Sequence, residues 1–460
     1  MYDFKWQSEK IKEIKPIMEL HAPCVIGNGI VDLDKEEEKY FEKMYDAFLG
    51  KSSMFIPASG SGSRMFQSFQ ENIGKNGAVL SAEAKKFFEN KEKFALYSVL
   101  PKSFQIATLT TEDKVKLMRY VISNDGLNFG NIPKGLFPFH KWNDDVLTPF
   151  QEQVLQGLQL SPKISFHFTI QEEYEDEILS SIKRILPKSY HPQNITFSSQ
   201  DKSNDSFVFT NRGELYIDKN GNNCKKPSGH GALLNNLKNL NADIILVKNI
   251  DNIQHFTKSA EGVRYFKILS GLLLHIKNEL SEILLNNDFE REEVLNNKYR
   301  LFHENKLERD KSALKSRLQR PLRICGMVLN EGAPGGGPFW VKNEKGFSKQ
   351  IVESAEVVDD SRQQELFKSS THFNPVFMVL DKMDMYGENY DLEDYMNPSR
   401  YLKVHKQQGG SQIQLIERPG LWNGSMHYWN TIFVEVPNNI FSPVKNVLDL
   451  LEDAHLSAND

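Results

Sequence analysis

Short apolar runs alternate with longer amphipathic stretches along most of this chain. Continuous apolar runs of this length indicate buried strands, and the clearest are SSMFI (52–56), KISFHFTI (163–170), ADIILVKNI (242–250), LRICGMVLN (322–330) and TIFVEVP (431–437). Helical patterns follow several of them, among them QEEYEDEILSSIKRIL and GALLNNLKNL. Alternation of strands and helices is typical of an α/β fold, so we expect a mixed, mostly parallel central sheet.

Two helical stretches interrupt this alternation. Residues 80–124 contain two helical patterns that begin at Ser or Thr caps, and residues 258–320 are helical and heavily charged. Both are interpreted as insertions, at about 66–130 and 256–320, and each could equally be a solvated surface subdomain without chemistry. The predicted organisation is an N-terminal helical segment (1–50), one main domain (51–450) and a C-terminal tail (451–460).

The composition is ordinary for a globular protein, with 460 residues of which 39% are hydrophobic and 25% charged. A net charge of −5 argues against a nucleic-acid-binding protein, which would carry a basic surplus. The cysteines Cys24, Cys224 and Cys325 are too far apart to suggest a disulfide framework or a structural zinc site. We see no signal peptide and no apolar run of the roughly 20 residues that a membrane span needs, so a cytoplasmic protein without a membrane partner is expected.

A glycine-rich turn follows the first apolar run, in the stretch IPASGSGSRM (56–65). A turn of this kind between a strand and a helix can direct its backbone N–H groups at an anion. The candidate anion-binding residues are therefore the loop Ser59, Gly60, Ser61, Gly62 and Ser63, followed by Arg64, whose guanidinium can form paired hydrogen bonds with phosphate oxygens. The stretch is neither a P-loop nor a dinucleotide fingerprint, and an ordinary tight turn is the alternative.

Charged residues follow other predicted strands and turns. Lys134 stands in a Pro-Lys-Gly step, and its compact ammonium group suits a phosphate, although a plain surface lysine is the alternative. Asp251 follows an apolar strand, where a carboxylate could hold Mg²⁺ against a polyphosphate or simply form a turn. Glu435 lies inside an apolar strand, where a carboxylate is costly to bury unless it is paired or bound to a metal.

The stretch KKPSGHGALLNNL (225–237) places two glycines at a predicted helix N-terminus. Gly229 and Gly231 could let a flat base or a phosphate approach the backbone closely. His230, between them, could contact the same ligand or serve as a capping or packing histidine. Lys445 follows a Phe-Ser-Pro turn near the end of the chain.

The order of these motifs resembles that of the sugar nucleotidyltransferases, and most closely the UDP-N-acetylhexosamine and UDP-sugar pyrophosphorylases. The chain looks like a bacterial relative of that branch. The matching stretches, which cover about half the chain in scattered blocks, are SGSGSRM (59–65), Pro133-Lys134-Gly135, Gln200, PSGHGALLNNL, NIDNI, QIVESAEV (350–357) and FSPVKN (441–446).

The resemblance implies a three-layer fold like that of the GT-A nucleotide-diphospho-sugar transferases. It also implies an enzyme that makes a nucleotide sugar from a nucleoside triphosphate, UTP by expectation, and a sugar 1-phosphate, releasing pyrophosphate. In that reading the nucleotide is bound by the loop at 59–63, Gln200, Gly229, His230 and Gly231. The catalytic residues are Arg64, Lys134 and Lys445. Asp251 and Glu435 hold Mg²⁺, and Glu353 and Asn423 contact the sugar.

Two other functions remain open. A glycosyltransferase that consumes a nucleotide sugar would usually carry an Asp-x-Asp metal motif, whereas Asp381 and Asp384 are spaced one residue too far apart. The differences from the family in the first loop also permit a non-catalytic protein that binds a nucleotide sugar.

Overall fold

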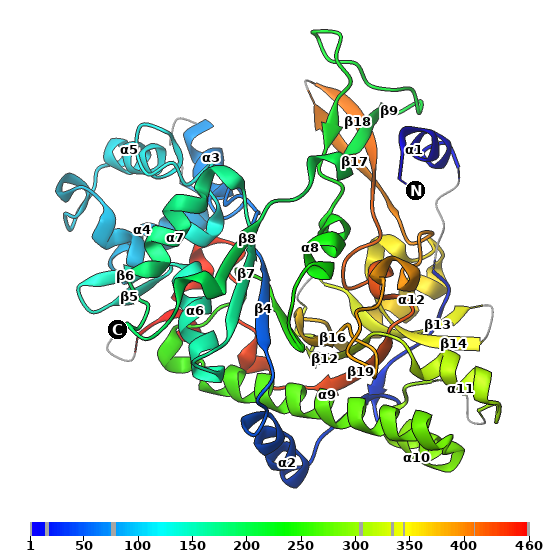
Figure 1. Cartoon of the computed structure of the whole chain (residues 1–460). Helices are drawn as coiled ribbons and strands as arrows, with labels where there is room; N and C mark the ends of the chain where they lie inside the picture. Colours follow the sequence, from blue (N-terminus) through cyan, green and yellow to red (C-terminus); the bar gives the residue numbers. More distant parts are fainter. Residues whose placement is uncertain are drawn as a thin grey trace. The chain divides into compact units, whose positions relative to one another are not determined.

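The computed structural model of the chain describes residues 2–13, 18–74, 80–302, 307–332, 335–343, 346–408 and 410–457. These residues form two compact units (Figure 1). The first consists of Met1–Ser52, Gln200–Val247 and Phe266–Pro437, and the second of Ser53–Ser199, Lys248–Tyr265 and Asn438–Asp460. The predicted 51–450 domain stays a prediction. Small parts of the predicted insertions (75–79 and 303–306) and of the predicted tail (458–460) lie outside the described residues.

The main sheet of the first unit is mixed and mostly parallel. Its strands lie in the order β2 (Val25–Ile26), β3 (Gly29–Val31), β19 (Asn430–Glu435), β12 (Leu322–Leu329), β16 (Phe377–Asp381) and β11 (Ile244–Lys248). The first four are joined by parallel pairs, whereas β12 is antiparallel to β16 and to β15 (His372–Phe373). The apolar runs predicted at 242–250, 322–330 and 431–437 are confirmed as buried strands.

Two smaller antiparallel sheets belong to the same unit. One has the order β1 (Leu20–Pro23), β13 (Gly337–Asn343) and β14 (Gly346–Val352), and the other the order β10 (Lys225–Lys226), β9 (Ser206–Thr210), β18 (Ser411–Glu417) and β17 (Leu402–Gln408). The prediction that residues 1–50 are helical is wrong in part, because β1, β2 and β3 lie there. These strands have four residues or fewer, too short to show alternation, and β1 and β3 pair with strands that are far away in the sequence.

The helices of the first unit include the long α9 (Ala260–Asn286), drawn in green in Figure 1, whose first residues are assigned to the second unit. Ile268, Leu272 and Ile276 are fully buried along one side of it, and the helix lies within the stretch 258–320 that was predicted to be helical. The other helices are α1 (Phe4–Lys10), α2 (Lys35–Asp46), α8 (Leu234–Lys238), α10 (Phe289–Tyr299), α11 (Lys311–Leu318) and α12 (Ser361–Lys368). Within the described residues, no helix combines the length and the apolar character needed to cross a bilayer.

The second unit contains the parallel strands β4 (Ser52–Pro57), β7 (Ser165–Thr169) and β8 (Ile195–Ser198), paired in that order. The connections include α6 (Pro149–Leu160) before β7 and α7 (Glu175–Lys183) after it, and a short hairpin is formed by β5 (His140–Trp142) and β6 (Asp145–Leu147). The predicted strands at 52–56 and 163–170 are confirmed.

The predicted helical stretch at 80–124 is also confirmed in the second unit. It contains α4 (Ala82–Glu89) and α5 (Thr111–Ile122), and α3 (Gln67–Gly74) precedes it. The Ser81 side chain accepts the N–H of Ala84 at the start of α4. Thr110 and Asp113 form a reciprocal capping box at the start of α5. The caps read from the sequence are therefore the caps that begin these helices.

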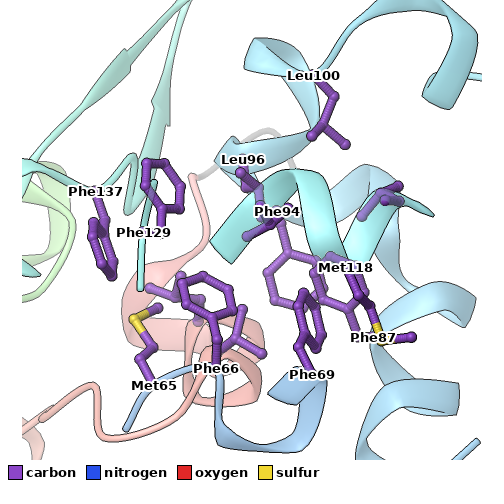
Figure 2. Close-up of a cluster of buried hydrophobic side chains, with 14 of the residues drawn as sticks. Met65, Phe66, Phe69, Phe87, Phe94, Leu96, Leu100, Met118, Phe129 and Phe137 are labelled. Carbon is purple, nitrogen blue, oxygen red and sulfur yellow. The ribbon is translucent and has the colours of Figure 1, made fainter. Parts of the chain in front are cut away.

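An aromatic core joins these helices to the glycine-rich loop and to the C-terminal segment of the same unit. Figure 2 shows Phe66 and Phe69 beside Phe87, Phe94, Phe129 and Phe137. Ring centroids lie 4.9 Å apart for Phe69 and Phe87 and 4.4 Å apart for Phe129 and Phe137, distances typical of favourable aromatic pairs. Val444, Val447 and Leu450 are buried in the same core. The core therefore fixes the chain directly after the glycine-rich loop.

Candidate functional site

The glycine-rich loop follows β4 in the second unit and is held by the segment that carries Lys134. Ser61 pairs with Pro133 in an antiparallel bridge. The Lys134 amide donates a hydrogen bond to the carbonyl of Gly60 over 3.2 Å. The structure therefore brings the predicted loop and the Pro-Lys-Gly step side by side, although they are far apart in the sequence.

The two glycines of this loop have different reasons to be glycine. A Cβ at Gly62 would lie 2.0 Å from the ring of Phe137, so the aromatic core leaves no room for a side chain there. A Cβ at Gly60 would meet no atom within 4 Å. Gly60 is thus the position where the backbone borders open space and a ligand could reach it.

Arg64 is exposed, and its guanidinium has no carboxylate partner among the described residues. It lines a cleft of about 490 Å³ in the second unit, together with Asn446 and Asp449 of the C-terminal segment. That segment forms a 3₁₀ helix, Val447–Leu451, that begins at the Asn446 cap. A guanidinium without a partner is available to bind an anionic ligand.

Lys134 and Lys445 both bind the Asp251 carboxylate. Their Nζ atoms lie 3.0 Å and 3.1 Å from Asp251 Oδ2. Lys134 Nζ also donates to the carbonyl oxygen of Val444, and the Val444 N–H donates to the Asp251 carbonyl over 2.9 Å. The three charged residues predicted from separate motifs therefore meet in one cluster of the second unit.

The lysine charges and the burial of the cluster shift the pKa values of Asp251 and Lys134. Burial alone would raise the pKa of Asp251, but the charges and hydrogen bonds of Lys134 and Lys445 outweigh it and hold the pKa below its usual value. Burial lowers the pKa of Lys134, and Asp251 offsets only part of that effect. The two lysines therefore hold the Asp251 carboxylate in its ionised form.

The Asp251 carboxylate is compatible with a magnesium ion. Both lysines bind Oδ2, and Oδ1 accepts no hydrogen bond from the described residues. Mg²⁺ commonly takes one or two protein carboxylates, with phosphate and water oxygens completing its coordination, so a single free carboxylate oxygen fits that use. Glu435, the other predicted ligand, belongs to the first unit and lies 3.6 Å from His372. Among the described residues, no cluster of three or more His, Cys, Asp or Glu side chains could hold a metal by itself.

The Gly229–His230–Gly231 turn opens a 3₁₀ helix, His230–Leu233, before α8 in the first unit. Gly229 has φ of +77°, a conformation that favours glycine. A Cβ at Gly231 would lie 2.1 Å from the carbonyl oxygen of Pro419. The close approach of this neighbouring chain accounts for Gly231, and a contact of these glycines with a base or a phosphate stays a prediction.

His230 is a neutral hydrogen-bond donor at this turn. Burial lowers its pKa to about 4. Its Nδ1 accepts the N–H of Leu421 over 3.0 Å, so the hydrogen of the neutral ring is on Nε2. Its ring stacks on Trp422 with centroids 4.3 Å apart. Nε2 lies 3.9 Å from Glu353 Oε1, too far for a direct hydrogen bond.

Asn423 binds the same Glu353 oxygen. Its Nδ2 donates to Glu353 Oε1 over 3.2 Å and to Glu356 Oε2 over 3.1 Å, while its buried Oδ1 has no partner among the described residues. Glu356 is paired with the buried Arg400 at 2.7 Å. Burial and the charge of Glu356 raise the pKa of Glu353. The predicted sugar-contact residues therefore lie together in the first unit, with His230 beside them.

Gln200 stays a prediction as a contact to the base. It belongs to the first unit, and its Nε2 is buried without a hydrogen-bond partner among the described residues. The sequence reasoning missed Arg400 and Trp422. Arg400 sits in an irregular polar stretch, where its burial leaves no local signal, and Trp422 precedes Asn423 in a stretch without a strand or helix pattern.

Comparisons with known proteins agree with this fold. The sequence model of a family described as "Domain of unknown function (DUF4301)" matches residues 2–456. No curated protein matches the chain. The uridine diphosphate N-acetylglucosamine pyrophosphorylase from Trypanosoma brucei has a similar structure, with a TM-score of 0.50 and 12% identity over 94% of this chain and 72% of that one. A variant of the UDP-glucose pyrophosphorylase from Leishmania major aligns with a TM-score of 0.48 and 13% identity over 98% of this chain and 76% of that one. The predicted nucleotidyltransferase-like α/β fold is confirmed.

Proposed function

The chain belongs to the DUF4301 family, and we propose that it is a sugar-1-phosphate nucleotidyltransferase. The observation that carries the proposal is the cluster of Lys134, Asp251 and Lys445 next to the open backbone at Gly60. Two ammonium groups and a carboxylate with one free oxygen, beside an accessible glycine turn, are the groups that a polyphosphate substrate requires. The similarity of the fold to a UDP-N-acetylglucosamine pyrophosphorylase supports the same reaction class.

In the proposed reaction a phosphate oxygen of the sugar 1-phosphate attacks the α-phosphorus of a nucleoside triphosphate, with UTP as the expected donor. A new P–O bond forms, the bond from the α-phosphorus to the bridging oxygen breaks, and pyrophosphate leaves with that electron pair. No proton needs to be removed from the attacking phosphate dianion. The protein therefore has to hold two anions in line and offset the charge that develops between them.

The groups of the second unit are assigned to the phosphates. Backbone amides of Gly60, Ser61 and Ser63 are the candidate cradle for the triphosphate, whereas the Gly62 N–H already donates to the Ile132 carbonyl over 3.4 Å. Arg64 offers its guanidinium to the departing pyrophosphate. Lys134 is mostly buried and fixed by two acceptors, so it suits a stationary charge beside the α-phosphate. Lys445 has 59% of its side chain exposed, so it can turn from Asp251 to the phosphate of the incoming sugar.

Asp251 is the residue that would hold Mg²⁺, through its free Oδ1. The ion would supply Lewis-acid neutralisation of the phosphate oxygens. Lys134 and Lys445 keep Asp251 ionised whether or not the ion is present, because their charges lower the pKa of the carboxyl. Glu435 belongs to the first unit and stays a separate prediction as a metal ligand.

The groups of the first unit are assigned to the sugar and the base. His230 Nε2 and Glu353 Oε1 are 3.9 Å apart, so one hydroxyl group placed at this gap could accept from the imidazole and donate to the carboxylate. Asn423 offers its unpaired Oδ1 to a second donor. Gln200, whose buried amide nitrogen has no partner among the described residues, remains the candidate to hydrogen-bond the edge of the base. Gly229 and Gly231 remain the candidates to contact its face.

The proposal is tested by incubating the protein with a panel of nucleoside triphosphates, sugar 1-phosphates and Mg²⁺, and measuring released pyrophosphate. We expect release that requires both substrates and falls about 10²–10³-fold in Lys445→Met. Lys163→Met removes an exposed lysine of the same unit and is the matched control, with unchanged release expected.

The alternative functions give other outcomes in the same experiment. A nucleotide sugar that binds without any turnover would point to a non-catalytic binding protein. Glycosyl transfer from a nucleotide sugar would point to a glycosyltransferase. No observation favours the latter, because the buried Asp381 is occupied by Lys277 at 2.8 Å.

A further inference from the structure

The C-terminal segment, residues 444–456, is tied to the second unit along its whole length. The Val447 N–H donates to the Met65 carbonyl over 3.1 Å, next to the glycine-rich loop. Val447 and Leu450 are buried in the aromatic core of Figure 2. Nearer the end of the chain, Lys258 binds both the carbonyl and the carboxylate of Asp453. The segment thus carries Lys445 at one end and is fastened at the other.

The last of these contacts is a hydrogen-bonded chain of three buried titratable side chains. Glu152 Oε1 lies 2.6 Å from His140 Nδ1, and His140 Nε2 lies 3.0 Å from His455 Nδ1. Glu152 and His140 are 0% exposed and His455 is 2% exposed. Only His455 belongs to the C-terminal segment, whereas His140 starts β5 and Glu152 is in α6. The hydrogen bond between the two imidazoles therefore joins the segment to the body of the unit.

This hydrogen bond can contain only one hydrogen. If His140 Nε2 donates, His455 Nδ1 must accept, and the reverse arrangement requires that His140 Nε2 accept. When both imidazoles are protonated, two N–H groups face each other over this contact and the bond is lost. No other protein group replaces it, because the remaining His455 Nε2 and Glu152 Oε2 are buried without partners among the described residues.

The surroundings oppose a positive charge at this bond. The His255 ring centroid lies 5.5 Å from that of His140, Lys258 acts on His455 with its positive charge, and Lys248 lies near Glu152. Burial and His255 lower the pKa of His140 well below its usual value, and burial, His140 and Lys258 lower that of His455 to about 3. Burial raises the pKa of Glu152 to about 8, so the nearby carboxyl supplies little negative charge.

We propose that His140 and His455 form a pH-dependent latch that holds the C-terminal segment, and Lys445 with it, in the second unit at neutral pH and releases it on acidification. The latch acts on the conformation of the segment and does not depend on which reaction the protein catalyses. Both histidines are positioning residues, since neither touches the Lys134–Asp251–Lys445 cluster.

The size of the effect follows from the two states of His455. A released histidine has a pKa of about 6.5, whereas the docked one has a pKa of about 3. Opening of the segment then takes up a proton at every pH between these values. Titration of His455 alone makes opening about 30-fold more favourable at pH 5 than at pH 8. Exposure of His140 during opening would add to this factor.

Hydrogen–deuterium exchange of the full-length protein, analysed by peptide and corrected for the intrinsic pH dependence of exchange, measures this opening. We expect protection of residues 445–456 to fall about 30-fold or more between pH 8 and pH 5 in the wild-type protein. The peptide covering α5 of the same unit serves as the reference and should keep its protection.

Two variants separate the latch from general acid sensitivity. His455→Asn retains a donor and an acceptor near the Nδ1 position but cannot be protonated, so the pH response of its segment should be smaller than that of the wild type by the roughly 30-fold factor that His455 contributes. His455→Phe removes the hydrogen bond, so its segment should be less protected than the wild type at pH 8. An equal pH response in wild type and His455→Asn, or no response in the wild type, would overturn the proposal.

Discussion

Lys134 and Lys445 bind the same carboxylate oxygen at nearly the same distance, yet their replacement should have different consequences. Lys134 and Asp251 have 12% and 15% of their side chains exposed, whereas 59% of the Lys445 side chain is exposed. Removing one partner of a mostly buried ion pair costs about 3–5 kcal/mol, because the other charge is left without compensation. An exposed partner is worth only about 0.2–1 kcal/mol.

The second lysine of the cluster reduces the expected cost of replacing Lys134. In Lys134→Met the carboxylate of Asp251 keeps Lys445, so we place the loss near the lower limit, at about 3 kcal/mol. A change of 1 kcal/mol shifts the melting temperature of a unit of 150–250 residues by about 2–4 °C. Lys134→Met should therefore lower the melting temperature of the second unit by about 6–12 °C, and Lys445→Met by less than about 4 °C.

The assay pairs thermal unfolding, followed by circular dichroism, with pyrophosphate release at a temperature where both variants are folded. Both variants should lose about 10²–10³-fold in turnover, although only Lys134→Met is strongly destabilised. This separation distinguishes a structural ion pair from a substrate-binding charge. Equal melting temperatures for the two variants, or full activity of folded Lys445→Met, would refute the reasoning.

Three further predictions concern other parts of the structure. Gly62→Ala should cost about 1–3 kcal/mol in unfolding free energy because its Cβ would overlap the ring of Phe137, whereas Gly60→Ala should leave urea unfolding unchanged and weaken triphosphate binding measured by calorimetry. Glu353→Gln should raise KM for the sugar phosphate more than for the triphosphate, and a uniform rise in both would contradict a sugar contact. The folded-state pKa of His455 lies below its unfolded value, so the stability that it contributes is complete above pH 6.5 and is lost as the pH falls toward 3. Chemical denaturation between pH 8 and pH 4 should show this loss, and a flat profile would be incompatible with it.

The strands were predictable from the sequence because they are buried on both faces and therefore appear as continuous apolar runs. β4 and β11 are examples in which every residue, or all but one, is buried. The strands β2 and β3 were not predictable, since they have only two and three residues and since β3, on which β2 pairs, is held by β19, which is distant in the sequence.

The candidate site was predictable only through the order of its motifs. Lys134 and Lys445 stand at turns and Asp251 follows an apolar strand, and nothing local to any of them indicates that both lysines bind the same Asp251 oxygen. The pairs that the sequence could not reveal depend on distant partners. His140 and His455 are 315 positions apart, and a buried histidine on a short strand looks the same in the sequence as an exposed one.

The identity of the reaction is tested most directly by one measurement, the release of pyrophosphate from UTP in the presence of Mg²⁺ and each of a set of sugar 1-phosphates. A nucleotidyltransferase should release pyrophosphate and nucleotide sugar in equal amounts, only when both substrates are present, and with a dependence on Lys445 but not on Lys163. A folded protein that forms neither product with any triphosphate or sugar phosphate would contradict the proposed function.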